Sequence, residues 1–246
     1  MVKIVIARYN EDIHWVIPII DYVIVYNKGE DDLDYIPTNK IIKCENLGKE
    51  SNTYLRYIIS NYDNLNDDNL NDYIMFIQGK VYDHMYNNDI IKSHNEIFSY
   101  IKSPKNYKFK FLSKNLIPVP LSDLVDYCSG IPAVPLKEID PIPIEKIQCE
   151  NLKLNSYKFI KKHELTKLIE QCGIQEPKRT ELFKLYSHEK INLNNYKYGA
   201  GALFICSKEC ILKHSKEYWE EIYSTTLEPN PSSGYGLEKL WKYLLS

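Results

Sequence analysis

The stretch that decides the fold is residues 3–12, which read KIVIARYNED. It begins with a run of apolar, mostly β-branched side chains and then turns polar at Arg8. A short apolar run of this kind is typical of a strand that is buried on both faces of a parallel sheet. Residues 21–26 and 73–77 repeat the pattern, and residues 40–44 form a shorter run between them. We therefore expect a mainly parallel sheet whose strands end in polar loops.

Segments with helical spacing follow these strands. Apolar residues recur every three or four positions from Ser51 to Asp63, with Ser51 or Asn52 expected at the N-cap. Similar signals predict helices over residues 87–101, 163–172, 207–212, 217–223 and 237–245, with Ser207 capping the third of these, and a strand over residues 202–206. Alternating strands and helices indicate an α/β fold with a mainly parallel central sheet flanked by helices.

Composition narrows the class of protein. The chain carries 31 Lys+Arg against 33 Asp+Glu, a net charge of −2, and so lacks the basic excess that binding a nucleic-acid backbone requires. No apolar run approaches the ~20 residues of a membrane-spanning helix, and the N-terminus has no signal-peptide pattern. We expect a soluble, cytoplasmic or otherwise intracellular protein with no nucleic-acid partner and no transmembrane segment.

Polar side chains gather where the expected strands end. Arg8, Asn10 and Glu11 follow the first strand, and Asn27 and Lys28 follow the second. Ligands of open α/β sheets bind beyond the carboxyl ends of the strands. Carboxylates and amides recognise hydroxyls, whereas cationic side chains recognise phosphate, so this set suits a nucleotide. The alternative is an ordinary solvated loop, and there is no G-x-G-x-x-G or P-loop motif to favour a dinucleotide or P-loop site.

Asp83 and His84 lie just beyond the strand of residues 73–77. A carboxylate beside an imidazole suits a divalent cation that neutralises phosphate charge. The alternative is a polar turn in which His84 is a surface or capping side chain.

Two features near the C-terminus are also candidates. Gly199 and Gly201, two of only nine glycines, precede the strand of residues 202–206, where the backbone needs either a close approach to a ligand or a simple turn. Glu238 borders the apolar face of the last helix and suits a general base, with a solvated helix face as the alternative. Trp241 on that face is expected to pack in the core. No Ser-His-Asp or Cys-His arrangement is visible, which disfavours a hydrolase with a covalent nucleophile.

Several of these residues belong to short motifs. They are I-A-R-Y-N-E-D at 6–12, Y-N-K-G at 26–29, N-x-G-x-E-x-x-T-Y-L at 46–55, N-Y-D at 61–63, F-x-Q-G-x-x-x-D-H at 76–84, G-x-x-F at 201–204 and E-x-x-W at 238–241. The set resembles a family of uncharacterised proteins, a domain of unknown function that is regarded as glycosyltransferase-like. The resemblance covers residues 3–84 and 199–241, and nothing is recognisable between residues 100 and 195.

That family looks related to the GT-A nucleotide-sugar-dependent glycosyltransferases. The resemblance implies a single GT-A-like, Rossmann-type domain in which the residue 46–48 segment, N-L-G, opens a helix. One departure is clear, because Gln78 and Lys80 stand where an Asp-x-Asp metal motif is expected. Either Asp83 and His84 take over metal binding, or Lys80 supplies the positive charge without metal, or the protein is degenerate and inactive.

The implied activity is transfer of a hexosyl group from a nucleoside diphosphate sugar, expected to be UDP-linked, to a hydroxyl of a glycan, protein or small molecule, with Mn²⁺ or Mg²⁺ as cofactor. Glu238 is the expected catalytic base, and Asp83 and His84 are the expected metal ligands. The expected nucleotide-binding residues are Ala7, Arg8, Asn10, Glu11, Asn27, Lys28, Gly29, Glu50, Gln78 and Lys80, and the expected acceptor or sugar pocket is Gly199, Gly201, Phe204 and Trp241. The alternatives are a sugar-nucleotide or glycan binding module without turnover, and a nucleotidyltransferase or hydrolase acting on the same donor.

These assignments define the domain organisation. We expect one domain over residues 1–246, since a chain of this length buries a full core by itself. Its nucleotide-binding half is expected in residues 1–100, a proline-rich variable segment in residues 101–195, and the acceptor side with the closing helices in residues 196–246.

Overall fold

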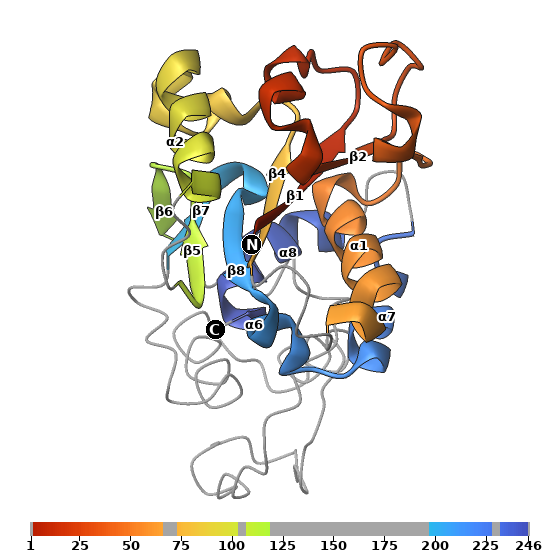
Figure 1. The fold of residues 1–246 in the computed structure, drawn as a ribbon. Coiled ribbons are helices and arrows are strands. Elements are labelled where there is room, and N and C mark those ends of the chain that lie inside the picture. Colours follow the sequence, from red (N-terminus) through yellow and green to blue (C-terminus); the bar gives the residue numbers. More distant parts are fainter. Residues whose placement is uncertain (1, 66–72, 103–106, 119–196, 228–231, 246) are drawn as a thin grey trace, which may run out of the picture.

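The computed structural model describes residues 2–65, 73–102, 107–118, 197–227 and 232–245 (Figure 1). The helix expected over residues 163–172 and most of the proline-rich segment lie outside these ranges. Within them, no helix combines the length and the apolar character that crossing a membrane requires.

The centre of the fold is a six-stranded sheet in the order β3-β2-β1-β4-β8-β5. Strands β1 (Val2–Arg8), β2 (Val23–Asn27), β3 (Ile41–Lys43) and β4 (Tyr73–Gln78) are mutually parallel. Strand β8 (Phe204–Ser207) pairs antiparallel with β4, and β5 (Phe109–Phe111) pairs antiparallel with β8. The expected mixed α/β architecture with a mostly parallel central sheet is therefore confirmed. A separate antiparallel pair joins β6 (Leu116–Pro118) to β7 (Lys197–Gly199).

Helices cover both faces of the sheet, because its central strands are apolar on both sides. One face packs against α1 (Lys49–Leu65), α6 (Lys208–Leu212), α7 (Lys216–Ser224) and α8 (Ser232–Leu244). The other packs against the 3₁₀ helix η1 (His14–Tyr22) and α2 (Ile90–Lys102). Figure 1 shows α1 and α7 on one side of β1 and β4 and α2 on the other. The 3₁₀ turn η2 (Thr38–Lys40) leads into β3, η3 (Val81–Asp83) follows β4, and η4 (Tyr86–Asn88) leads into α2.

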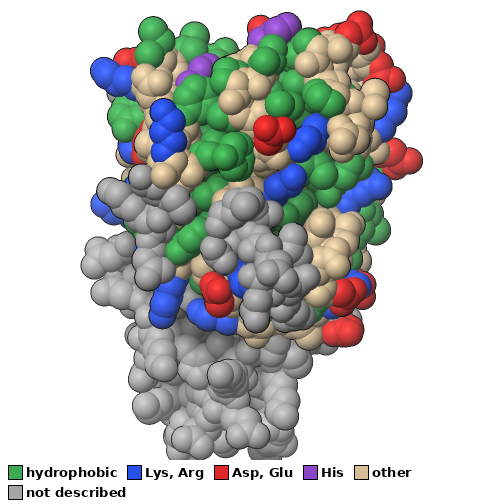
Figure 2. Space-filling view, viewed as in Figure 1, with side chains coloured by type: hydrophobic (Ala, Val, Ile, Leu, Met, Phe, Trp, Pro, Cys, Tyr) green, Lys and Arg blue, Asp and Glu red, His purple; other side chains and the backbone are tan. Residues whose placement is uncertain are grey.

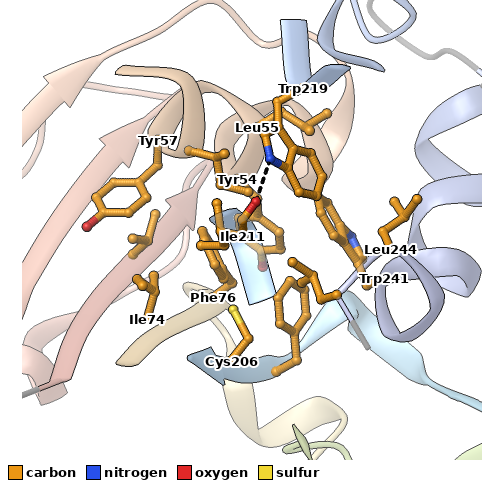
Figure 3. Close-up of a cluster of buried hydrophobic side chains, with 14 of the residues drawn as sticks. Tyr54, Leu55, Tyr57, Ile74, Phe76, Cys206, Ile211, Trp219, Trp241 and Leu244 are labelled. Carbon is orange, nitrogen blue, oxygen red and sulfur yellow. Dashed lines mark hydrogen bonds between the residues drawn. The ribbon is translucent and has the colours of Figure 1, made fainter. Parts of the chain in front are cut away.

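The core between the sheet and α1, α7 and α8 is rich in aromatic rings (Figure 3). The ring of Tyr54 lies 5.0 Å from that of Phe76 and 5.9 Å from that of Trp241, measured between centroids. Trp219 is fully buried, and its indole Nε1 donates to the carbonyl of Ile211 at 3.0 Å. Burial of so much aromatic surface fixes α7 and α8 against the sheet.

Several boundaries differ from the sequence-based predictions. The expected N-cap at Ser51 or Asn52 is wrong, because the helix begins at Lys49 and the Asn52 amide already donates to the Gly48 carbonyl at 3.1 Å. Strand β2 begins at Val23 because η1 extends to Tyr22. Ser207 does precede α6, but its hydroxyl makes no capping bond and instead donates to Cys210 Sγ.

Near the C-terminus two further elements start elsewhere. Strand β8 begins at Phe204, since Gly201 has a positive φ of 79° within the 3₁₀ turn η7 (Ala200–Ala202). Helix α8 begins at Ser232, several residues before its apolar stripe starts at Leu237. The face drawn in Figure 2 shows acidic and basic side chains interspersed among hydrophobic ones.

Candidate functional site

The carboxyl ends of β1, β2 and β4 lie side by side at one edge of the sheet. Arg8 at the end of β1 is in register with Asn27 at the end of β2, and Ala7 is in register with Gln78 at the end of β4. The sequence-based expectation that the polar loops after these strands share one rim is therefore confirmed. In open α/β sheets this rim is where ligands bind.

Arg8 is the most heavily bonded side chain of the rim. It is 2% exposed, and its guanidinium donates to the carbonyls of Glu11 and Glu30 and to Asn27 Oδ1, each at 2.9 Å. Its remaining nitrogen, Nη2, lies 2.6 Å from an Asp32 carboxylate oxygen. A guanidinium bonded in this way connects the loop after β1 to the loop after β2. The Asp32 carboxylate balances its positive charge, so Arg8 does not need a phosphate as its partner.

Three more of the expected nucleotide-binding residues serve the same pair of loops. Asn27 Nδ2 donates to the Glu30 carbonyl, and the Glu30 amide donates to Asn10 Oδ1, both at 2.9 Å. A Cβ at Gly29 would lie 1.5 Å from the Tyr9 carbonyl oxygen, so only glycine fits this crossing. Asn10, Asn27 and Gly29 therefore make contacts that hold the two loops together, in place of the nucleotide contacts that the sequence predicts for them.

Lys28 holds the beginning of α1. Its Nζ donates to the carbonyls of Leu47 at 2.6 Å and Lys49 at 2.5 Å. Burial lowers the pKa of Lys28 to about 8, although the neighbouring Glu50 carboxylate opposes this shift. The lysine therefore links the end of β2 to the start of the helix that carries Glu50.

A second group of polar side chains meets at Gly201. Glu238 Oε1 accepts a hydrogen bond from the Gly201 amide at 2.7 Å. A Cβ at Gly201 would lie 2.2 Å from His84 Cδ2 and 2.9 Å from Gln78 Nε2. Residues from α8, η7, the turn after η3 and the end of β4 thus converge on one glycine.

Glu11 adds a further carboxylate to this side of the rim. A Cβ at Gly79 would lie 2.9 Å from Glu11 Cβ and 3.0 Å from its Oε2. The Tyr9 amide donates to the same Oε2 at 2.7 Å, while the Gly79 amide donates to the Ala7 carbonyl at 3.0 Å. The Glu11 carboxylate therefore lies against the residue that follows Gln78.

Glu50 and Tyr54 interact electrostatically with the carboxylates of this group. Burial raises the pKa of Glu50, and the charge of Glu238 raises it further. Burial also raises the pKa of Tyr54 well above its usual value, with added contributions from the charges of Glu50, Glu238 and Glu11. We call Glu11, Glu50 and Glu238 the carboxylate cluster. Sequence reasoning missed Tyr54, although its position four residues after Glu50 placed it on the same helix face.

The expected metal ligand Asp83 lies beside a lysine. Its Oδ2 is 3.1 Å from Lys80 Nζ, and the bond to Asp83 raises the pKa of Lys80. Within the described ranges, no three His, Cys, Asp or Glu side chains lie close enough together to hold a metal ion. Asp83 and His84 therefore do not fit a metal centre built from protein side chains alone, which needs more ligands than these two.

The expected acceptor residues are divided between the site and the core. Gly201 contacts the polar group, as described above. Phe204 and Trp241 are fully buried, with their rings 5.2 Å apart, and Trp241 packs in the core as its helical spacing predicted. Gly199 is buried against Phe111, whose Cδ1 would lie 2.9 Å from an added Cβ. Gly199, Phe204 and Trp241 are therefore buried among other residues and do not line an open pocket.

The fold and site define a mixed α/β protein with a polar, carboxylate-rich group at the carboxyl edge of its parallel strands. Comparison with protein-family models, curated proteins and solved structures finds no match for the chain. The functional argument therefore rests on the residues at this edge.

Proposed function

We propose that this chain is a glycosyltransferase of GT-A type, which moves a glycosyl group from a nucleoside diphosphate sugar to an acceptor hydroxyl. The observation that carries the proposal is the hydrogen bond from the Gly201 amide to Glu238 Oε1 at 2.7 Å, beside Gln78 and His84. It holds a carboxylate in a fixed position at the sheet edge where α/β proteins bind ligands. The resemblance described above supports the proposal, and the residue 46–48 segment precedes α1 as that resemblance implies.

In this proposal Glu238 is the general base. Its Oε1 is held by Gly201, so Oε2 is the oxygen that takes the proton from the acceptor hydroxyl. The acceptor oxygen then bonds to the anomeric carbon as the bond from that carbon to the diphosphate oxygen breaks. The diphosphate leaves with the electron pair of the broken bond.

The charge on the leaving diphosphate requires a cation. Lys80 is the residue proposed for this role, since it follows the end of β4 and its side chain is 47% exposed. Arg8 and Lys28 are excluded from the role by their bonds within the protein. The polar side chains of Gln78 and His84 are then proposed to bind the glycosyl group, because amides and imidazoles recognise hydroxyls.

The test combines binding and turnover in the full-length chain. The melting temperature is measured with a panel of nucleoside diphosphates and their sugar conjugates, with Mn²⁺, Mg²⁺ or EDTA, and release of nucleoside diphosphate is followed with candidate acceptors. For Glu238→Gln we expect the ligand-induced shift to remain while turnover falls by about 10²–10⁴-fold. Glu220→Gln, an exposed carboxylate on α7, is the matched control and should behave as wild type. Wild-type turnover in Glu238→Gln would eliminate the mechanism.

One observation favours a second candidate, a binding module that captures a sugar nucleotide or glycan without turnover. Gln78 and Lys80 stand where acidic metal ligands are expected, and Asp83 is paired with Lys80. This candidate requires a ligand-induced rise in melting temperature with no product from any donor and acceptor pair. Turnover that EDTA abolishes would instead identify a metal-dependent transferase, and Asp83→Asn would then show whether Asp83 is needed for metal binding.

A further inference from the structure

The hydroxyl of Tyr54 is buried in the core without a hydrogen-bond partner among the described residues. Its ring lies in the middle of the aromatic cluster, 5.0 Å from Phe76, 5.7 Å from Phe204 and 5.9 Å from Trp241 (Figure 3). The side chain is 0% exposed, and its hydroxyl has no hydrogen-bond partner among the described residues. Phenylalanine would supply the same packing without leaving a buried hydroxyl unpaired, so packing alone does not account for the hydroxyl.

The position of Tyr54 on α1 directs its hydroxyl toward the candidate site. Glu50 precedes Tyr54 by four residues, so the two side chains lie on one face of the helix. Side chains on a helix lean toward its N-terminus, and the N-terminal turn of α1 is the one that carries Glu50. On α8, Glu238 lies one turn before Trp241, whose ring contacts that of Tyr54.

The charged groups around this position come from three other elements as well. Glu50 faces the carboxylate of Glu238 on α8 and the ammonium groups of Lys28 after β2 and of Lys49 on its own helix. Tyr54 experiences the charges of Glu50, Glu238 and, from the loop after β1, Glu11. Each carboxylate already accepts one backbone hydrogen bond, Glu238 from Gly201, Glu11 from Tyr9 and Glu50 from its own amide, and a carboxylate can accept several more. The high pKa of Tyr54 keeps its hydroxyl protonated, so it remains an additional donor.

We propose that Tyr54 is a positioning residue of the candidate site, whose hydroxyl donates a hydrogen bond to one bridging water that in turn donates to the Glu50 carboxylate. This bridge stabilises ionised Glu50 in its half-buried position next to Glu238 and holds it toward the end of β4. The inference rests on the proposed function for its place in catalysis, whereas the hydrogen bond itself requires only the folded protein.

The test is a titration that needs no substrate. The full-length chain is labelled with ¹³C at the glutamate carboxyl carbons, and the Glu50 signal is assigned as the one missing from Glu50→Gln. We expect Tyr54→Phe to raise the titration midpoint of Glu50 by about 0.5–1 pH unit, because the ionised form loses a donor. The melting temperature should stay close to that of wild type, because the ring and its contacts with Phe76, Phe204 and Trp241 remain.

Tyr57→Phe is the matched control. Tyr57 lies on the same helix, is 5% exposed and packs against Phe76. Burial raises its pKa, with smaller contributions from Tyr26 and Cys206 and not from the carboxylate cluster. Removing the Tyr57 hydroxyl should leave the titration midpoint of Glu50 unchanged. A Glu50 titration curve that is identical in wild type and Tyr54→Phe would overturn the inference. A shift in Tyr54→Phe without any glycosyl transfer by the wild type would keep the inference and reject the proposed function.

Discussion

At the scale of single residues, Arg8 shows the limit of reasoning from a strand-end motif. An arginine directly after a buried strand predicts a phosphate ligand, and its position at the rim is confirmed. The pattern could not specify its partners, because the carbonyl of Glu30 and the carboxylate of Asp32 lie in a loop whose path depends on how β1 and β2 pair. A buried guanidinium with this many partners is a structural element of the rim.

Lys28 leads to a prediction about pH. Its pKa is about 8 in the folded chain, against an ordinary value of 10.5. Between these two pH values the unfolded chain binds a proton that the folded chain does not bind, so the free energy of unfolding rises with pH. Below pH 8 both states hold the proton and this gain is absent. We expect wild type to gain on the order of 1–3 kcal/mol relative to Lys28→Met as the pH is raised from about 8 to about 10.5.

Urea unfolding of wild type and Lys28→Met across that range measures the effect, since other groups that titrate are common to both proteins and cancel in the difference. Lys43→Met serves as control, because the Lys43 side chain is 71% exposed and pairs with Asp31 at the surface. Its pH dependence should follow that of wild type. Parallel curves for wild type and Lys28→Met would show that burial does not perturb Lys28.

At the scale of elements, the turn η7 determines how Glu238 meets the end of β4. Gly201 has a φ of 79°, and a Cβ there would lie 2.2 Å from His84 Cδ2. We expect Gly201→Ala to destabilise the fold by about 1–3 kcal/mol, through backbone strain and displacement of His84. It should also remove any nucleotide-dependent rise in melting temperature.

Gly234→Ala provides a matched glycine variant for this experiment. Gly234 lies in α8, and a Cβ there would meet Lys49 Cδ at 3.5 Å, an ordinary van der Waals contact. We expect it to be neutral or to stabilise the fold by about 0.5–1 kcal/mol, as alanine does when it replaces glycine in a helix. Chemical denaturation of both variants gives the comparison. Equal stabilities for Gly201→Ala and wild type would mean that η7 tolerates a side chain.

The same elements show what the sequence pattern could and could not predict. The buried strands β1, β2 and β4 were visible because short runs of apolar, mostly β-branched residues are typical of strands buried on both faces. The start of α8 was missed because Ser232, Ser233 and Gly234 are typical turn residues, whereas here they begin a helix that is held by its later apolar face. The side chains of β1, β2 and β4 are enough to predict those strands, whereas the start of α8 depends on tertiary packing.

At the scale of the whole molecule, the two ends of the described chain interleave. Strand β8, from the C-terminal part, lies between β4 and β5, and α7 and α8 pack against α1. Asn52 on α1 donates to Thr226 Oγ1 at 3.0 Å, and Lys216 pairs with Asp63 at 2.6 Å. The candidate site has the same origin, because Glu238 and Gln78 meet at Gly201 only through this interleaving. That is why the sequence could name these residues as candidates but could not derive their proximity from spacing.

Interleaving predicts that both ends of the chain unfold together. Neither end of the chain retains a complete core when the other is removed, since Tyr54 and Phe76 pack against Trp241 and Phe204. In Trp15→Phe, fluorescence reports on Trp219 and Trp241 alone, and hydrogen exchange of amides in β1 and β4 reports on the other end. We expect the urea midpoint from fluorescence and the opening free energy from exchange to give one stability, as in a two-state transition. If α7 and α8 detached at lower urea while β1 and β4 stayed protected, the site would be assembled by docking two separately stable parts.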